Sequence, residues 1–203
     1  TLFPYTTLFR SRPLILASTS VSRKQTLERL GFAFETATPQ VDENAWKEKG
    51  LPATVLAETL ALEKAKNVGA RISGGVVIGA DQVLKVEGKT LSKPSTPEAA
   101  QAQLRILSGK THSLITAVAV WTRDGVYKYT DISRLTVREL DDQMILRYVL
   151  KDKPLDACGG YKFESHGVGL FERVETQDPT AIVGLPILWL GGLLQELGYK
   201  WLE

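Results

Sequence analysis

At the centre of this chain stands the stretch Gly75-Val76-Val77-Ile78-Gly79-Ala80-Asp81-Gln82-Val83-Leu84. A continuous apolar run of β-branched residues bounded by glycines predicts a buried strand. The run ends in a carboxylate, Asp81, that packing does not explain. Ligands of open α/β sheets lie just beyond the carboxyl ends of strands, so Asp81 is placed where chemistry is expected. The alternative is an ordinary solvated aspartate at a strand end.

Length and composition limit the class of protein. A chain of 203 residues with 43% hydrophobic and 24% charged content is globular and long enough for one large domain or two small lobes. A net charge of +2 argues against a protein that binds duplex nucleic acid, although local basic clusters could still hold phosphates. The single cysteine, Cys158, excludes an internal disulfide and predicts a reducing compartment, hence the cytoplasm. No apolar run approaches the roughly 18 residues of a membrane span.

The first eleven residues differ in character from the rest. They have neither the basic start nor the small-residue cleavage site of a signal peptide. They resemble the translation of a cloning adaptor, so we expect a non-native extension over residues 1–11 and a single domain over residues 12–203. A natural disordered arm is the alternative.

Working outward toward the N-terminus, Leu14-Ile15-Leu16-Ala17 predicts a first buried strand, followed by a hydroxyl-rich loop, Ser18-Thr19-Ser20-Val21-Ser22-Arg23-Lys24. Ser22 and Gln25 match a capping box, which predicts a helix that starts at Ser22 and ends at Gly31. Free backbone N–H groups at a helix N-terminus bind anions, and the two basic residues of the loop would add positive charge. A solvated helix cap is the alternative.

An alternating segment, Phe32 to Thr36, predicts a second strand, and a polar turn with two adjacent carboxylates, Val41-Asp42-Glu43, follows it. Loops are often acidic simply because they are solvated. The functional interpretation is a metal ligand, because Mg²⁺ binds through one or two carboxylates plus phosphate oxygens. Glu43 and Asp81 would supply that pair if the fold brings them together.

Two lysines flank the central stretch. A helix is predicted from Ala53 to Val68, with Lys64 on the same stripe as Leu56 and Leu60. The pattern favours a lysine that snorkels from the core edge over a cation directed at a ligand. After a hairpin at Glu87-Gly88, proline in Lys93-Pro94 pushes the lysine into an extended conformation, which suits a side chain held toward one target.

The C-terminal half predicts mixed architecture. Thr96 caps a helix that Ser108-Gly109 closes, and residues 112–122 and 126–137 form a hairpin. Helices are expected over residues 141–150 and 185–197. Strands interspersed with helices, with two hairpins among them, predict an α/β fold with a mixed sheet.

A glycine-rich segment, Asp156 to Glu172, marks backbone that turns sharply or approaches something closely. Glu164 within it is a carboxylate that can accept hydrogen bonds from a nucleobase. Cys158 and His166 also lie there, but a single cysteine and two histidines give no zinc ligand set of known spacing.

From Leu14 onward the chain resembles the Maf nucleotide pyrophosphatases. Leu16-Ala17-Ser18-Thr19-Ser20-Val21-Ser22-Arg23-Lys24 is similar to their Ser-x-Ser-Pro-x-Arg-Arg signature. Further motifs follow in the family's order, namely Val41-Asp42-Glu43, Glu63-Lys64-Ala65, Gly79-Ala80-Asp81-Gln82, Lys93-Pro94, Gly159-Gly160-Tyr161 and Val183-Gly184-Leu185-Pro186. The resemblance implies a mixed twisted sheet flanked by helices, in two lobes with a central cleft, as in inosine triphosphatases.

The resemblance also implies an activity: hydrolysis of a nucleoside triphosphate between the α and β phosphates, to the monophosphate and pyrophosphate, with a divalent cation, Mg²⁺ or Mn²⁺. Carried over position by position, Asp81, Glu43 and Lys93 match catalytic positions, with Asp81 either the base or a metal ligand beside Glu43. The substrate-binding positions are Ser18, Ser20, Arg23, Lys24 and Lys64. Cleaving a phosphoanhydride is mostly charge neutralisation and positioning, which these residue types can supply.

Three positions bear on the choice of substrate. Gln82 after the aspartate and Glu164 in the glycine-rich loop resemble the 7-methyl-GTP type, whereas the dTTP/UTP type carries Thr and Gln there. A carboxylate suits methylated guanine, which carries positive charge. Ser22 departs from the tryptophan frequent in the 7-methyl-GTP type. Two further departures concern the signature: Lys24 in place of arginine loses bidentate phosphate contact, and Val21 in place of proline makes the loop less rigid.

Two alternatives to this enzyme remain. The first is a dTTP/UTP pyrophosphatase, and the second a nucleotide-binding regulator of septum formation that needs no turnover. The combination of Asp81, Glu43 and Lys93 favours the enzyme, because a pure binding module does not need a full hydrolytic set. The resemblance further implies a homodimer, while charge and the lack of a basic, aromatic face argue against nucleic-acid partners.

Overall fold

The computed structural model describes residues 12–72 and 74–201, and the extension predicted over residues 1–11 lies outside them. Within the described residues, one seven-stranded sheet has the order β2-β1-β3-β5-β6-β7, with β4 paired to β3. The strands are β1 (Leu14–Ala17), β2 (Glu35–Thr36), β3 (Val76–Val86), β4 (Lys89–Leu91), β5 (Thr111–Thr122), β6 (Gly125–Val137) and β7 (Phe171–Glu175). β1 is parallel to β2 and β3, and the other pairings are antiparallel. The mixed α/β sheet predicted from the sequence is confirmed.

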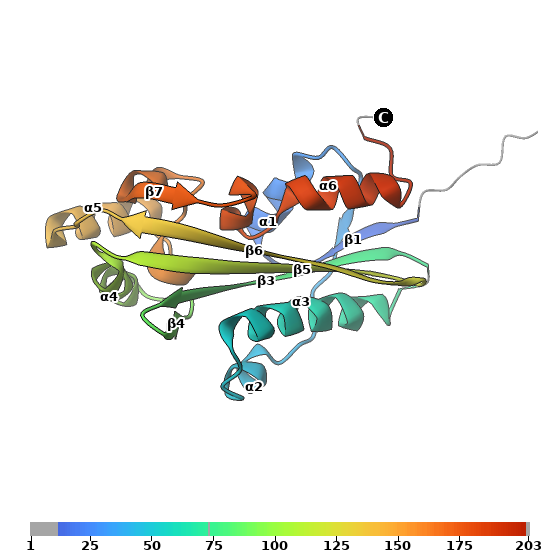
Figure 1. The fold of residues 1–203 in the computed structure, drawn as a ribbon, viewed down its shortest axis with the longest axis horizontal. Coiled ribbons are helices and arrows are strands. Elements are labelled where there is room, and N and C mark those ends of the chain that lie inside the picture. The colour runs from blue at the N-terminus through green and yellow to red at the C-terminus, as the bar shows by residue number, and fades with distance from the viewer. Residues whose placement is uncertain (1–11, 73, 202–203) are drawn as a thin grey trace, which may run out of the picture.

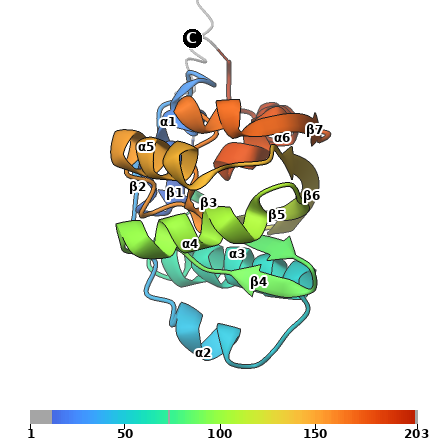
Figure 2. The same ribbon diagram turned by 90° about the vertical axis from the view of Figure 1, so that its left-hand side faces the viewer.

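Helices cover both faces of the sheet (Figure 1). They are α1 (Val21–Glu28), α2 (Glu43–Lys47), α3 (Ala53–Gly69), α4 (Pro97–Leu107), α5 (Asp142–Asp152) and α6 (Ile187–Glu196), with short 3-10 segments η1 (Cys158–Gly160), η2 (His166–Leu170) and η3 (Pro179–Val183). Figure 2 shows α3 and α4 on one side of the sheet and α1, α5 and α6 on the other.

Side-chain alternation along β3 determines which helix each residue meets. Ile78 and Ala80 join the cluster that packs beneath α1 and α6, whereas Val83 packs in the cluster built on α3. Because successive side chains of a strand point to opposite faces, Asp81 faces α3 and its neighbour Gln82 faces the other way.

The central strand continues past the point where the sequence predicted its end. β3 runs to Val86, so Asp81 lies in the middle of the strand, paired with Ala117, and the prediction of a strand-end aspartate is wrong. The reason is that β5 pairs with β3 along nearly its whole length. On the other edge of β3, pairing with β1 stops at Gly79 and pairing with β4 starts at Leu84. Residues 80–83 therefore lie at a gap in that edge, just beyond the carboxyl end of β1.

The molecule has two lobes that share the long strands. One core cluster lies under α1 and α6, and includes Leu27 and Leu190. A second cluster lies at the other end of the sheet, where α4, α5 and β4 gather, and includes Leu104 and Ile145. Two lobes joined through β3, β5 and β6 agree with the expected architecture.

Most predicted elements are present, but several boundaries differ. The first helix begins at Val21 and is capped by Ser20, whose Oγ accepts from the backbone N–H of Arg23, so the predicted cap at Ser22 is wrong. β2 has only two residues. Residues 43–47 are helical rather than a plain turn because Asp42 Oδ1 accepts from the backbone N–H groups of Asn44 and Ala45. β7 and the three 3-10 segments were not predicted.

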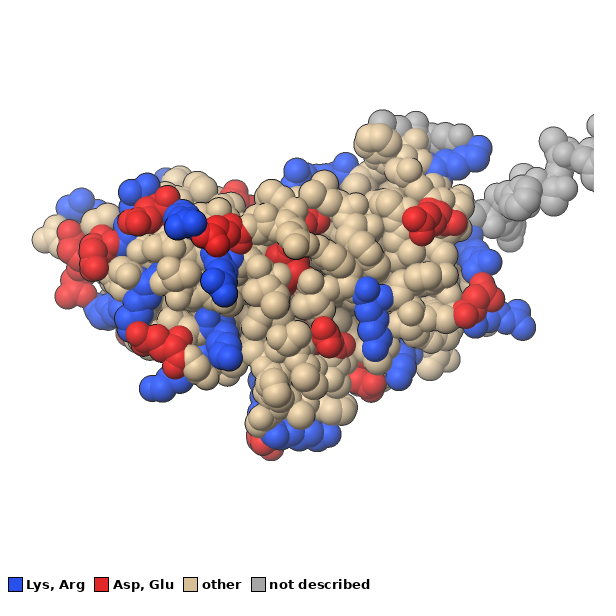
Figure 3. All heavy atoms as spheres, viewed as in Figure 1, with Lys and Arg blue, Asp and Glu red and all other residues tan. Residues whose placement is uncertain are grey.

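The surface charges are mixed. On the face drawn in Figure 3, basic and acidic side chains alternate toward the end of the molecule that carries α4 and α5, without forming one continuous basic surface.

In the part of the chain that the structure describes, every helix is too short or too polar to cross a membrane.

Candidate active site

A cleft of about 440 Å³ opens at the gap between β1 and β4, between the two lobes. Its walls come from the loop before α1, the helices α2 and α3, the centre of β3, the segment after β4 and the glycine-rich region. The structure thus brings together residues that are far apart in the sequence. Ten of the eleven predicted site residues line this cleft: Ser18, Ser20, Ser22, Arg23, Glu43, Lys64, Asp81, Gln82, Lys93 and Glu164.

A buried ion pair forms the floor of the cleft. Lys64 Nζ lies 2.7 Å from Asp81 Oδ1 and 2.7 Å from Glu43 Oε1, so one ammonium bridges two carboxylates from separate elements. Lys64 and Asp81 are only 5% and 7% exposed. Helix α3 can approach β3 this closely because Gly79 has no side chain to keep the helix away. Lys64 therefore does not snorkel to solvent as the sequence pattern suggested.

The two carboxylates are in different electrostatic environments. Burial raises the pKa of Asp81 above its usual value, and Lys64 and Arg23 only partly offset that effect. Partial burial also raises the pKa of Glu43, but Lys64, Lys47 and Lys93 outweigh it and hold that pKa below its usual value. Glu43 is therefore the more firmly ionised carboxylate, whereas Asp81 binds a proton more readily.

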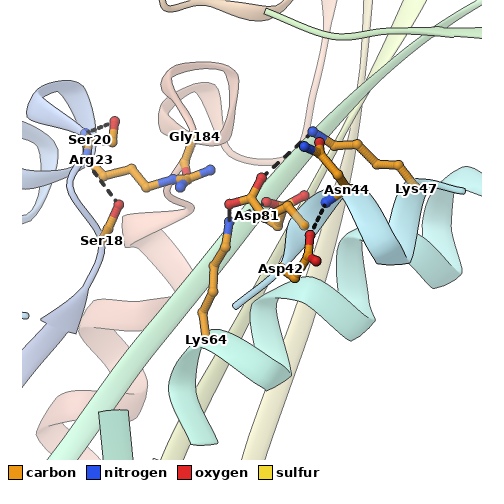
Figure 4. A network of polar contacts seen from close by, with 10 residues as sticks. Ser18, Ser20, Arg23, Asp42, Asn44, Lys47, Lys64, Asp81 and Gly184 are labelled. Atoms are coloured by element: carbon orange, nitrogen blue, oxygen red, sulfur yellow. Dashed lines mark hydrogen bonds and ion pairs between the residues drawn. The ribbon is translucent and has the colours of Figure 1, made fainter. Parts of the chain in front are cut away.

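The serine-rich loop holds its own shape and places Arg23. Ser18 Oγ accepts from the backbone N–H of Ser20, and Ser20 caps α1. Val21 occupies the first helical position, which tolerates any residue compatible with a helical φ, so the loss of proline there leaves the helix start intact. Arg23 Nε donates to the carbonyl of Gly184 at 3.0 Å. Figure 4 shows the guanidinium extending from α1 toward Asp81.

Two predicted specificity residues contact each other across the cleft. Ser22 Oγ donates to Glu164 Oε1 at 2.8 Å, which joins α1 to the glycine-rich region. Gln82 faces η3 and donates through Nε2 to Thr116 Oγ1 and to the carbonyls of Ala181 and Ile182. The amide group of Gln82 thus fixes the wall of the cleft as well as lining it.

The predicted basic positions differ in their placement. Lys93 lines the cleft from the segment between β4 and α4, and Gln103 holds that segment through a 2.8 Å hydrogen bond to the carbonyl of Ser92. Lys24, the eleventh predicted residue, is not among the residues that line the cleft. It lies 3.9 Å from Glu28 on the exposed side of α1. The geometry gives no support to a phosphate contact by Lys24.

The sequence reasoning missed other residues of this site. Lys47, Asn44 and Asp156 also line the cleft. Lys47 follows Glu43 by four residues, a spacing that would have indicated a shared helical face had α2 been predicted. The 3-10 segment beside Arg23 depends on a buried carboxylate, Asp178, which accepts from the backbone N–H groups of Thr180 and Leu188. No local pattern in the sequence distinguishes Asp178 from a solvated aspartate.

The residues present fit a divalent cation only in part. Among residues 12–72 and 74–201, no group of three or more His, Cys, Asp or Glu side chains could hold a metal ion by itself. Two carboxylates, Glu43 and Asp81, do approach the same point, since both contact Lys64. In the structure the Lys64 ammonium occupies that point, so a divalent cation would need its remaining ligands from substrate phosphate oxygens and water.

Comparison with known proteins gives the following relatives. The family model described as "Maf-like protein" matches residues 13–197. A protein of Bdellovibrio bacteriovorus named 7-methyl-GTP pyrophosphatase is 45% identical over 185 residues, which cover 91% of this chain and 97% of that protein. A protein of the same name from Xanthomonas oryzae pv. oryzae is 42% identical over 186 residues, covering 92% of this chain and 97% of that protein.

Among solved structures, a nucleoside-triphosphatase / dITP/XTP pyrophosphatase of Mycobacterium abscessus matches 63% of this chain and 75% of that chain. The TM-score is 0.40 and the sequence identity 18%, a likeness too distant to support an argument.

Proposed function

Since this chain belongs to the Maf-like protein family, we propose that it is a nucleoside triphosphate pyrophosphatase that hydrolyses 7-methyl-GTP to 7-methyl-GMP and pyrophosphate. Relatives of that name match more than nine-tenths of the chain. The observation that carries the proposal is the floor of the cleft, where Lys64 bridges Asp81 and Glu43. Carboxylates and cations gathered in one cleft are the parts that phosphoanhydride cleavage requires.

The chemistry assigns a part to each group. Asp81 takes a proton from water, the water oxygen attacks the α phosphorus, and the bond to the oxygen that bridges the α and β phosphates breaks to release pyrophosphate. The raised pKa of Asp81 suits a base that must accept this proton. Arg23 and Lys93 offset the charge of the phosphates, and Lys64 holds both carboxylates in place.

A divalent cation, Mg²⁺ or Mn²⁺, would be held by Glu43 and would supply further neutralisation of phosphate charge. Asp81 would be its second ligand in the alternative in which Asp81 does not serve as the base. The lowered pKa of Glu43 supports this assignment, because a hard cation needs an ionised oxygen ligand.

The nucleobase of the substrate would lie where Ser22 contacts Glu164. The carboxylate of Glu164 is exposed, so it can accept hydrogen bonds from the guanine edge and attract the positive charge of the methylated ring. We further propose that the protein acts on the nucleotide pool of the cytoplasm as a homodimer. Measurement of its mass in solution tests the dimer.

The first experiment is an assay of pyrophosphate release with Mg²⁺ or Mn²⁺ on 7-methyl-GTP, GTP, dTTP, UTP and CTP. We expect turnover of 7-methyl-GTP above all others. A preference for dTTP or UTP would reject the assignment of Gln82 and Glu164 as specificity residues. Binding without any turnover would favour the non-catalytic regulator instead.

The role of Asp81 has its own test. Asp81→Asn keeps the shape of the side chain but removes the base, so we expect pyrophosphate release to fall by about a hundredfold or more, in line with the loss of a general base. The circular dichroism spectrum should match that of the wild type. Turnover close to that of the wild type would exclude Asp81 from the mechanism.

A further inference from the structure

Lys47 is a cation of the cleft that no motif of the sequence indicated. It lies at the end of α2, four residues after Glu43, and both side chains line the cleft. Residues four apart share one face of a helix. Trp46 packs instead toward the cluster on α3, and Lys49 lies over the Trp46 ring with its Nζ 3.5 Å from the ring centroid. The turn of α2 therefore directs Lys47 into the site and Lys49 away from it.

The charge of Lys47 remains available to a ligand. Its Nζ lies 3.8 Å from Glu43 Oε2, a long ion pair, while the other oxygen of Glu43 is held at 2.7 Å by Lys64. The side chain of Lys47 is 42% exposed. Figure 4 shows it extending from α2 toward the carboxylates, from the side opposite Arg23. The positive charge of Lys47 also acts at the glycine-rich wall of the cleft. Burial raises the pKa of the Cys158 thiol, and the charges of Lys93 and Lys47 act to lower that pKa.

Lys47 also restores the number of cations expected at this site. The family resemblance implied four basic residues at this site, namely Arg23, Lys24, Lys64 and Lys93, but Lys24 pairs with Glu28 outside the cleft. Arg23, Lys64 and Lys93 remain, and the charge of Lys64 is shared between two carboxylates. A triphosphate carries several negative charges, so further neutralisation is needed.

We propose that Lys47 contacts the phosphate chain of the nucleotide and takes the place that the sequence assigned to Lys24. This inference rests on the proposed function for the identity of the ligand. It adds α2 to the elements that hold the substrate.

The test compares Lys47→Met with Lys49→Met. The second variant is the control, because it removes the same charge two residues further along the chain, from a side chain that points away from the cleft. The probe is the α,β-methylene analogue of 7-methyl-GTP, which cannot be cleaved, and its Kd is measured by calorimetry with Mg²⁺. We expect the Kd of Lys47→Met to rise roughly tenfold, as for the loss of one charged hydrogen bond. The Kd of Lys49→Met should stay within about twofold of the wild type.

A second readout is salt dependence. Because salt screens charge, the Kd of the wild type and of Lys49→Met should rise more steeply with NaCl concentration than that of Lys47→Met. Equal affinities and equal salt dependence of the two variants would overturn the proposal. Tighter Mg²⁺ binding by Lys47→Met with unchanged nucleotide affinity would also overturn it, since Lys47 would then act only on Glu43.

The binding assay does not depend on turnover. An enzyme that binds the analogue but cleaves no nucleotide would reject the proposed function and leave the contact of Lys47 intact. Full activity on the nucleotide, with equal Kd values for the two variants, would support the proposed function and reject the contact of Lys47 with the phosphate chain.

Discussion

At the scale of single residues, the candidate site is built around a lysine that the sequence pattern assigned to the core edge. Lys64 follows Leu56 and Leu60 on one helical stripe, and such a lysine usually snorkels to solvent. Here its ammonium stays buried because two carboxylates satisfy it. Charges that are buried and paired in this way are costly to separate.

Removal of Lys64 tests this pairing. Lys64→Met leaves Asp81 buried without its closest cation, so we expect the free energy of unfolding at neutral pH to fall by about 3 kcal/mol and pyrophosphate release to be lost. Urea denaturation gives the stability. Lys66→Met is the matched control, because Lys66 lies on the same helix in an exposed pair 3.9 Å from Glu63. That variant should change stability by less than about 0.5 kcal/mol.

A buried histidine gives the protein a dependence on pH outside the cleft. His112 is 2% exposed, and burial lowers its pKa from 6.5 to about 4. Its Nε2 lies 2.7 Å from the hydroxyl of Tyr161, and the rings of Tyr161 and Phe171 surround it. A depressed pKa means that the unfolded chain takes up a proton more readily. We therefore expect the contribution of neutral His112 to stability to be present above pH 6.5 and to be lost as the pH falls toward 4.

The size of that effect follows from the shift. His112 should account for about 3 kcal/mol of the stability lost between pH 6.5 and pH 4. Glutamine does not titrate, so the free energy of unfolding of His112→Gln should fall correspondingly less than that of the wild type between those two pH values. Urea denaturation at each pH measures the difference. An equal loss in the variant and the wild type would show that other groups cause the acid sensitivity.

At the scale of elements, the site depends on how closely α3 lies on β3. A Cβ on Gly79 would lie 2.2 Å from the carbonyl oxygen of Ala61 and 2.6 Å from the backbone nitrogen of Ala65. Backbone atoms of a helix cannot give way individually, so the whole helix would have to move. Lys64 would move with it and away from Asp81.

Gly79→Ala should therefore destabilise the protein by about 3 kcal/mol, the upper part of the range for overpacking, and should also lower kcat. Thermal unfolding and the pyrophosphate assay measure the two effects. Gly192→Ala on α6 is the control, since nothing lies within 4 Å of a Cβ there. In a helix that change should stabilise by up to about 1 kcal/mol. A fully active Gly79→Ala variant would contradict this account of the α3 contact.

At the scale of the whole molecule, the cleft lies where two lobes share long strands, and one hydrogen bond crosses its opening. Ser22 and Glu164 come from opposite lobes and are separated by 142 positions in the sequence. Under the proposed function, a nucleobase bound here would meet the carboxylate of Glu164, and the preference for a positively charged ring would then depend on residues of both lobes.

Glu164→Gln tests that dependence. We expect the ratio of kcat/KM for 7-methyl-GTP to that for GTP to fall about tenfold, because a charged acceptor becomes a neutral one. Glu172→Gln removes the same charge from an exposed position on β7 that does not line the cleft, and should leave the ratio unchanged. Identical ratios in the two variants would mean that Glu164 does not select the base.

The sequence by itself determined the mixed sheet, the main helices and most of the charged residues that line the cleft. Periodicity and turn residues carry that information locally, as for β5, β6 and α3, and ordered motifs indicated Asp81, Glu43 and Arg23. Only the tertiary structure decided how far β3 extends, because pairing with β5 is a long-range contact.

The tertiary structure alone also decided which charges meet. Whether Lys64 is solvated or bridges two carboxylates depends on the packing of α3 against β3, and whether Lys24 or Lys47 enters the cleft depends on how α1 and α2 are oriented. A side chain's type sets the interactions it can make. Its partners are set by contacts between segments distant in sequence, which local patterns do not encode.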